Sequence, residues 1–310
     1  MNSSWGFRDV FYTKRRRLKL VIGSRMVDQS FINLGGLRWR CDYVLDSPPH
    51  IPRERLKQYF DGRLAKVGDV DIERIRTIYL STDAISYIEQ FLQRIESLFT
   101  GTFVVDTRDV SLTKKPDWIG GAASWAAPHI SNPFSSSGLC IPVGLEERRL
   151  LTNNLPWLFN ETNNKFDKIL VGPFAKTHSS RILFFDMNSS NTITKKLKRL
   201  SPLSYSYVAR KYKFIACPRG NGIDTHRVWE SLKRKAVPIV LDNEWSRYFI
   251  QKGIPMLALQ DFQEMYSFSE RQLSDFYEQR LDLLERNHLL FTNSFWMHEI
   301  LHHSNQSPKS

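Results

Sequence analysis

The sequence predicts an α/β protein of two domains, each built on a parallel sheet. Two stretches, one in each half of the chain, run from an apolar strand through an amphipathic helix to a second apolar strand, the pattern of a parallel crossover unit. The chain has 310 residues, of which 41% are hydrophobic, so each half can bury a core of its own. Ligand sites in such sheets lie beyond the carboxyl ends of the strands.

The crossover unit of the first half covers residues 77–107. Residues 77–82 and 102–107 are apolar runs typical of buried strands, and Asp83 is suited to cap the helix between them. Apolar residues recur in that helix at helical spacing, namely Ile85, Ile88, Phe91, Leu92 and Ile95. Earlier in the chain, residues 18–23 form a plausible strand and 47–52 a turn-rich break.

The crossover unit of the second half covers residues 212–241. A strand is predicted over 212–217 and must stop at Pro218, which cannot donate to a ladder, and a second strand is predicted over 236–241. Asp224 or Thr225 is a suitable cap for the helix between them, whose apolar positions are Val228, Trp229, Leu232 and Ala236. Gly220 and Gly222 allow backbone angles with positive φ and let a ligand approach the main chain closely.

A polar segment separates the two halves. Residues 153–164 are rich in asparagine and interrupted by Pro156, so we place an N-terminal domain at 1–160 and a C-terminal domain at 161–310. Ser267 and Glu270 match a capping box for a C-terminal helix, and the last helices, ending near His303, are able to pack back on the first domain.

The loop of the second crossover unit has the features of an anion site. The N-terminus of a helix attracts phosphate, and Arg219 and Arg227 can add charge-assisted hydrogen bonds. Glu230 follows Arg227 by three residues on the same helix face, where a carboxylate suits a ribose diol. The alternative is structural, with Arg227 paired to Glu230 and the two glycines serving only the turn.

The residues of this segment resemble a known family. The run 218–230 (Pro-Arg-Gly-Asn-Gly-Ile-Asp-Thr-His-Arg-Val-Trp-Glu), followed by Val-Pro-Ile-Val at 237–240, is similar to the donor-binding segment of exostosin-like glycosyltransferases, including short soluble members encoded by large algal viruses. The likeness continues at 170–181, at 253–259 and at Phe295-Trp296, and more faintly at 125–132 and 141–146.

The resemblance implies a fold and an activity. It implies a GT-B-like architecture, two Rossmann-like domains with parallel sheets facing across a cleft, and inverting transfer of a sugar from a UDP-sugar to a hydroxyl of a glycan acceptor without a bound metal. Xylose is the first choice of sugar because the short viral relatives suggest it. The donor-binding residues that it implies are Arg181, Arg219, Gly220, Asn221, Gly222, Asp224, Thr225, His226, Arg227 and Glu230.

Inverting transfer also needs a base for the acceptor proton. Asp83, Asp106, His129 and Glu146 are candidates because they lie at predicted strand ends or in loops of the first domain. Each has a structural alternative: Asp83 as a helix cap, Asp106 and Glu146 in loop salt bridges, and His129 as a surface residue.

The charge of the chain favours anionic partners. Its formal net charge is +12, and cations cluster at 14–19 and 195–199. Nucleotide sugars, acidic glycans, nucleic acid and anionic membranes all satisfy that charge. A nucleic-acid-binding protein is therefore one alternative function, although no recognised module supports it.

A zinc metallopeptidase is the other alternative. His298, Glu299 and His302 match H-E-x-x-H, which on a helix puts both histidines on one face. Little chain follows this motif to supply a third zinc ligand. Asp69 and Asp71 match the D-x-D metal motif of other glycosyltransferases only superficially, because they precede a predicted strand instead of following one.

Cysteine usage and hydropathy predict a location. The three cysteines are widely spaced, so neither a disulfide framework nor a thiolate metal site is indicated, and a reducing compartment fits best. No apolar run is long enough for a membrane span or a signal peptide. We therefore expect a soluble, cytoplasmic protein, a departure from the anchored exostosins unless an anchor lies outside this sequence.

Overall fold

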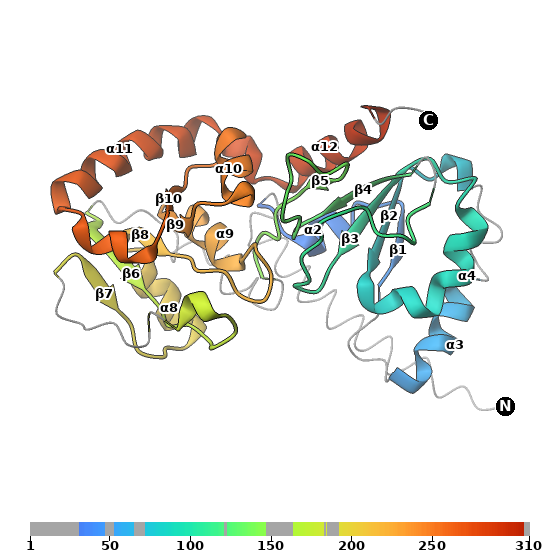
Figure 1. Cartoon of the computed structure of the whole chain (residues 1–310), viewed down its shortest axis with the longest axis horizontal. Helices are drawn as coiled ribbons and strands as arrows, with labels where there is room; N and C mark the ends of the chain where they lie inside the picture. Colours follow the sequence, from blue (N-terminus) through green and yellow to red (C-terminus); the bar gives the residue numbers. More distant parts are fainter. Residues whose placement is uncertain are drawn as a thin grey trace.

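The computed structural model describes residues 31–46, 53–64, 72–120, 123–146, 164–182, 184 and 192–306. Two five-stranded sheets with parallel pairing form two units side by side (Figure 1), which confirms the predicted fold class. The expected strand at 18–23, the break at 47–52 and nearly all of the expected linker at 153–164 lie outside the described residues.

The first sheet has its strands in chain order. It consists of β1 (Tyr43–Leu45), β2 (Thr77–Ser81), β3 (Thr102–Asp106), β4 (Ser124–Ala127) and β5 (Leu139–Cys140), all paired in parallel. The predicted crossover unit is present, because α4 (Ile85–Ile95) joins β2 to β3 and buries Ile88, Phe91, Leu92 and Ile95. Short helices complete this unit: α2 (Leu34–Arg38), α3 (Arg53–Leu64), η1 (Ile72–Arg74) and η2 (Thr82–Ala84).

The second sheet has the order β10-β9-β8-β6-β7. Its strands are β6 (Phe166–Val171), β7 (Thr194–Lys196), β8 (Tyr212–Ala216), β9 (Val237–Leu241) and β10 (Leu257–Leu259). The second predicted crossover unit is also present, because α9 (His226–Lys233) joins β8 to β9, which pair in parallel from Phe214 opposite Val237. The other elements are η4 (Ser179–Arg181), α8 (Pro202–Ala209), α10 (Glu244–Gln251), η5 (Phe262–Ser267), α11 (Glu270–Arg286) and η6 (His288–Phe291).

The last helix leaves the second unit and packs on the first. Helix α12 (Asn293–Gln306) lies over β4 and β5 in Figure 1, and Thr102 of β3 donates to the carbonyl of Ile300 at 3.3 Å. At the start of α12, the side chain of Asn293 accepts from the backbone N–H of Asn33 at 3.1 Å and donates to the carbonyl of Phe31 at 3.1 Å. The end of the chain is thereby tied to the first sheet.

One apolar core is continuous between the two units. It runs from the first sheet through the fully buried Trp296 of α12 to Phe249 of α10 and Trp229 of α9, whose rings contact one another edge-on. A second core fills the other face of the second sheet, beneath α11. Because burial of large aromatic side chains dominates core energetics, the shared core holds the two units together.

One local expectation, the position of a helix cap, is wrong. Helix α11 begins at Glu270 and its capping box is formed by Ser269 and Gln272, because Ser267 ends the preceding 3-10 helix. Gly220 and Gly222 have ordinary backbone angles, since positive φ among the described glycines occurs at Gly144, Gly172 and Gly253.

The position of this cap can be tested by substitution. Replacing Ser269 with Ala removes the hydroxyl that accepts from the N–H of Gln272 at 3.2 Å, and should lower the free energy of unfolding by about 1 kcal/mol. Ser267→Ala is the matched control, and should have a much smaller effect. Urea unfolding of both variants measures the difference, and an equal loss in both would contradict the assignment of the cap.

Candidate functional site

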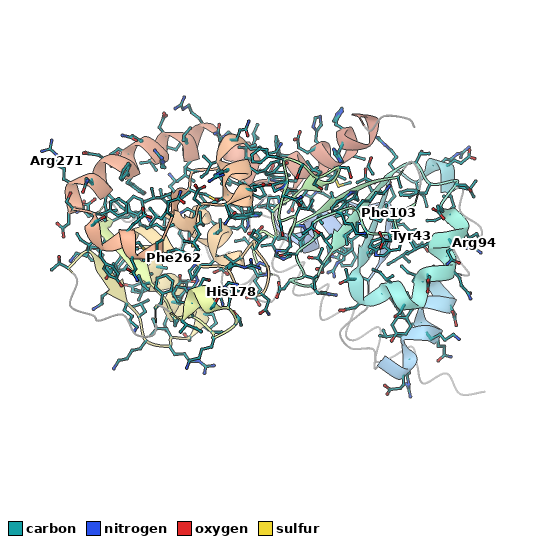
Figure 2. All side chains as sticks on the ribbon, in the orientation of Figure 1. Tyr43, Arg94, Phe103, His178, Phe262 and Arg271 are labelled. Atoms are coloured by element: carbon teal, nitrogen blue, oxygen red, sulfur yellow. The ribbon has the colours of Figure 1, made fainter. Side chains whose placement is uncertain are left out.

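Three arginines converge beside the loop that joins β8 to α9. Arg219 lies in the loop, Arg227 in the first turn of α9, and Arg181 at the end of η4. These are three of the residues expected to bind an anion. Figure 2 labels the neighbouring His178 on the side of the second unit that faces the first sheet.

Arg227 is held in place by groups outside its own helix. Its Nη2 donates to the carbonyl of Pro173 at 2.9 Å, and its guanidinium carbon lies 4.8 Å from the ring centres of both Phe174 and Tyr205. The other terminal nitrogen, Nη1, is buried and has no hydrogen-bond acceptor within the described part of the chain. Arg227 is thus oriented by protein contacts while one donor stays unused.

Arg181 and Arg219 show the same combination of fixed and unused donors. Arg181 donates to the Thr177 hydroxyl at 2.8 Å and more weakly to the Pro218 carbonyl at 3.4 Å, and Arg219 donates to the carbonyl of Asn221 at 3.0 Å. The Nε atoms of both arginines are buried, and no residue that the structure describes accepts from them. Burial, together with repulsion from the charge of Arg227, lowers the pKa of Arg181.

An anion with several oxygens satisfies these groups. Buried N–H donors without an acceptor cost free energy, and like charges held close together repel each other. A phosphate supplies both the missing acceptors and the compensating negative charge. The ring of Tyr205 lies beside Arg227, and its buried hydroxyl, which has no partner among the residues described, adds a further polar group to the cluster.

The opposite side of the same segment is used within the protein. Asp224 is 3% exposed, and its carboxylate accepts from the backbone N–H of Val143 in the first unit at 2.7 Å and from the indole N–H of Trp229 at 2.9 Å. Burial raises the pKa of Asp224 to about 8, against the lowering effect of these donors. Asp224 is therefore a residue of the junction between the units, and its carboxylate is occupied by donors of the protein.

Gly222 and His226 also face the first unit. A Cβ atom on Gly222 would lie 2.4 Å from Cε1 of His129, so the close approach that this glycine permits is that of a side chain from the other unit. His226 donates from Nδ1 to the carbonyl of Gly144 at 2.7 Å. These two members of the expected donor site belong to the junction as well.

The remaining expected donor residues divide between surface and interior. Asn221 is exposed, Thr225 is the N-cap of α9 without a side-chain cap bond, and Gly220 lies under Arg181, whose Nη2 is 3.0 Å from the position of an added Cβ. Glu230 is 4% exposed, close enough to Tyr205 for its charge to act on the pKa of that residue.

His129 is buried at the junction rather than exposed. It is 2% exposed, its Nδ1 accepts from the backbone N–H of Asp224 at 3.3 Å, and its Nε2 lies 3.7 Å from the carboxylate of Asp109. Burial lowers the pKa of His129 to about 4. With both ring nitrogens facing protein groups, His129 is a poor candidate for the base.

Asp83 and Asp106 share one arginine. Arg108 pairs with Asp83 at 3.2 Å, with Asp106 at 3.1 Å and with Asp46 at 2.9 Å. Carboxylates at the carboxyl ends of β1, β2 and β3 therefore surround a single cation. Asp106 also accepts from the Tyr79 hydroxyl at 3.2 Å and from the backbone N–H of Arg108 at 3.1 Å. These contacts fit the structural alternative for both residues. Glu146 is half-buried at the end of a described segment.

Asp109 is a site residue that the sequence analysis missed. Its carboxylate is 59% exposed and approaches His129, and its charge acts on Arg181 across the junction. Arg108 and Asp109 both have positive φ, at 48° and 69°, a conformation that costs free energy in residues other than glycine. The pattern of hydrophobicity does not reveal a turn of this kind. The signal in the sequence was the position of Asp109 three residues beyond β3, where residues of ligand sites are expected.

Within the described part of the chain, the H-E-x-x-H motif of the zinc alternative has no third metal ligand beside it. The rings of His298 and His302 lie on one face of α12 with centres 4.1 Å apart, and Glu299 pairs with Lys252 at 3.3 Å. His303 instead faces the carbonyl of Ser137 at 3.0 Å. Among the described residues no three His, Cys, Asp or Glu side chains are grouped as metal ligands. Asp69 and Asp71 lie outside those residues.

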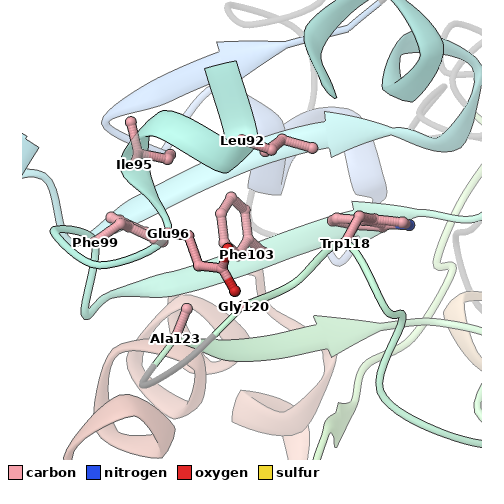
Figure 3. Close-up of a pocket in the computed structure, with 8 residues that line it drawn as sticks. All are labelled: Leu92, Ile95, Glu96, Phe99, Phe103, Trp118, Gly120 and Ala123. Carbon is pink, nitrogen blue, oxygen red and sulfur yellow. The ribbon is translucent and has the colours of Figure 1, made fainter. Parts of the chain in front are cut away.

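A recess in the first unit is unrelated to the arginine cluster. It lies between α4 and β3, and its walls include Phe99, Phe103 and Trp118 beside the carboxylate of Glu96 (Figure 3). It has no room for a water molecule. Its size and mostly apolar lining identify it as a packing defect of the core.

Comparison with known proteins identifies no family. No protein-family model matches the chain, and no curated protein matches it significantly. Among solved structures, it is similar to a glycosyltransferase from Rickettsia africae ESF-5, with a TM-score of 0.44, 9% identity and coverage of 84% of each chain.

Two further solved structures are similar to a comparable degree. An α,α-trehalose 6-phosphate synthase from Burkholderia multivorans has a TM-score of 0.43 and 10% identity over 88% of this chain and 80% of that chain. A spinosyn rhamnosyltransferase complexed with thymidine diphosphate has a TM-score of 0.35 and 13% identity over 81% of this chain and 72% of that chain.

No helix in the described part of the chain is both long enough and apolar enough to cross a bilayer.

The buried state of His129 makes stability depend on pH. Its pKa is about 4 in the folded protein against an ordinary value of 6.5, so its contribution to stability is complete above pH 6.5 and is lost as the pH falls toward 4. The loss corresponds to about 3 kcal/mol. His129→Asn keeps an acceptor for the Asp224 N–H but does not titrate, so its free energy of unfolding should fall less over this range.

Denaturant unfolding of both proteins between pH 4 and 7 measures this difference. The exposed His288, substituted by Asn, is the matched control. Parallel curves for wild type and His129→Asn would contradict the assignment.

Proposed function

We propose that the chain is a glycosyltransferase that moves a sugar from a nucleoside diphosphate to a hydroxyl group. The observation that carries the proposal is the set of buried N–H donors on Arg181, Arg219 and Arg227 that have no acceptor among the described residues. A diphosphate provides enough oxygens for all three guanidinium groups. The resemblance of the segment 218–230 to exostosin-like enzymes selects a sugar nucleotide among diphosphate ligands.

The proposed donor is a UDP-sugar, with xylose as the first choice from the resemblance. Arg181, Arg219 and Arg227 bind its diphosphate, and Glu230 is proposed to accept from the ribose hydroxyls. The loop that carries the proposed site is fixed to the first unit by contacts of Asp224, Gly222 and His226. The acceptor is proposed to be a glycan hydroxyl on the side of the first sheet.

The proposed reaction is a single displacement with inversion. The acceptor oxygen forms a bond to the anomeric carbon while the bond from that carbon to the β-phosphate oxygen breaks. The arginines stabilise the negative charge that develops on the departing diphosphate. Because they already supply positive charge, the proposal does not require a metal ion, and chelator should leave activity unchanged.

Asp109 is the proposed base for the acceptor proton. Its carboxylate is exposed at the junction and acts electrostatically on Arg181, whereas Asp83 and Asp106 are paired with Arg108. The acceptor hydroxyl would transfer its proton to Asp109 as the new glycosidic bond forms, and His129 would hold the Asp109 carboxylate in position. The base must lie within reach of the acceptor hydroxyl, and an exposed carboxylate at the junction supports this role for Asp109.

Removal of an arginine tests the diphosphate site. Each charged hydrogen bond is worth roughly 1.5–3 kcal/mol, so Arg227→Ala should weaken UDP binding about 10-fold to 100-fold. Arg227→Lys should restore part of the affinity, because lysine keeps the charge but not the planar fork. Titration calorimetry with UDP measures the effect, and Arg271→Ala on exposed α11 is the control. Unchanged UDP affinity in the alanine variants of Arg181, Arg219 and Arg227 would refute the site.

Substitution of carboxylates separates the candidate bases. Asp109→Asn should lower kcat by roughly 10²-fold to 10⁴-fold and leave UDP binding unchanged, since asparagine tolerates positive φ and keeps the shape of the side chain. Asp83→Asn is the matched control and should lower kcat far less, because Asp83 serves Arg108. Sugar transfer and UDP release are measured in parallel. A larger loss of kcat in Asp83→Asn than in Asp109→Asn would contradict the proposal and would assign the base to Asp83, at the end of β2.

A further inference from the structure

The segment from β7 through α8 exposes both cations and apolar side chains. Every residue from 198 to 204 is exposed, and this run contains Lys198, Arg199, Leu200 and Leu203. Leu200 is 36% exposed, and Leu203 and Tyr207 are each 45% exposed. Together with Lys195, these side chains form a surface that we call the α8 face, made of Lys195, Lys198, Arg199, Leu200, Leu203 and Tyr207.

The charge of this face is of one sign. Residues 194–213 contain seven Lys and Arg and neither Asp nor Glu. Among the described residues, no carboxylate pairs with Lys195, Lys198 or Arg199, whereas Lys213 at the end of the run pairs with Asp167 at 2.7 Å. The three exposed cations are therefore available to an external anion.

The apolar residues of α8 are on its outward side as well as its inward side. Tyr205 and Ala209 are buried, which accounts for the inner face. Leu203 and Tyr207 are four residues apart and therefore share the outer face. Solvent-exposed faces of helices are normally polar, so an outward apolar pair within a cationic surface indicates a partner that is both anionic and apolar.

We propose that the α8 face docks on a membrane surface that contains anionic phospholipids. Exposed cations attract the headgroups, and leucine and tyrosine side chains enter the boundary between headgroups and acyl chains. A nucleic acid would pair with the cations but would leave Leu200 and Leu203 in water. The ring of Tyr207 is already contacted by Arg210 at 4.5 Å and Lys211 at 4.9 Å, which leaves it less suited to stacking on a base.

Docking of this face places the arginine cluster close to the membrane. Tyr205, on the inner side of α8, contacts Arg227 with 4.8 Å between its ring centre and the guanidinium carbon. The anion site is therefore one helix away from the docked surface. The docking itself is independent of sugar transfer, so it can fail or hold whether or not the proposed activity is present.

Vesicle flotation of the full chain tests the proposal. The protein should float with vesicles of phosphatidylcholine and phosphatidylglycerol and stay in solution with phosphatidylcholine alone. Lys198→Gln with Arg199→Gln should weaken partitioning about fivefold for each charge removed. Leu203→Ser with Tyr207→Ser should also weaken it, although every cation remains.

The control carries the same loss of charge elsewhere. Arg94→Gln with Arg271→Gln removes two exposed cations that Figure 2 labels at opposite ends of the molecule, and partitioning should be unchanged. Equal losses in the control and in the Lys198 and Arg199 variant would overturn the proposal, as would equal binding to neutral vesicles. If Leu203→Ser with Tyr207→Ser bound normally and single-stranded DNA displaced the vesicles, the face would be a polyanion site and the membrane assignment would be wrong.

Discussion

The relative position of the two sheets depends on the buried carboxylate of Asp224. It accepts a hydrogen bond from Val143, just beyond β5, and another from Trp229 within α9. Trp229 is itself fully buried and packs edge-on against Phe249. A buried carboxylate that lost its donors would cost several kcal/mol, so the loop before α9 cannot shift relative to the first sheet without that penalty.

The same short segment has two faces with different tasks. Gly222, Asp224 and His226 face the first unit, while Arg219 and Arg227 belong to the proposed anion site. The junction contacts orient the start of α9, and the helix in turn orients Arg227 between Phe174 and Tyr205. A site preorganised in this way loses little free energy in ordering its side chains when a ligand binds.

The excess of positive charge is distributed unevenly over the described residues. Arg108 is surrounded by Asp46, Asp83 and Asp106, so its charge is compensated within the protein. The arginine cluster and the α8 face have fewer acidic neighbours, and they lie on opposite sides of the same helix. The net charge alone does not distinguish these regions, because it counts charges without regard to their spacing.

The sequence by itself determined the crossover units at 77–107 and 212–241 and the position of Arg219 and Arg227 beside one loop. Those features follow from local periodicity, strand-ending proline and resemblance, which are readable along a single stretch of chain. The tertiary structure decided that Asp83 and Asp106 serve Arg108, that Asp224 and Gly222 face the first unit, and that Asp109 lies opposite Arg181. These relations join residues up to 95 positions apart, as His129 and Asp224 are, and no local pattern encodes which side chains meet once both sheets have packed.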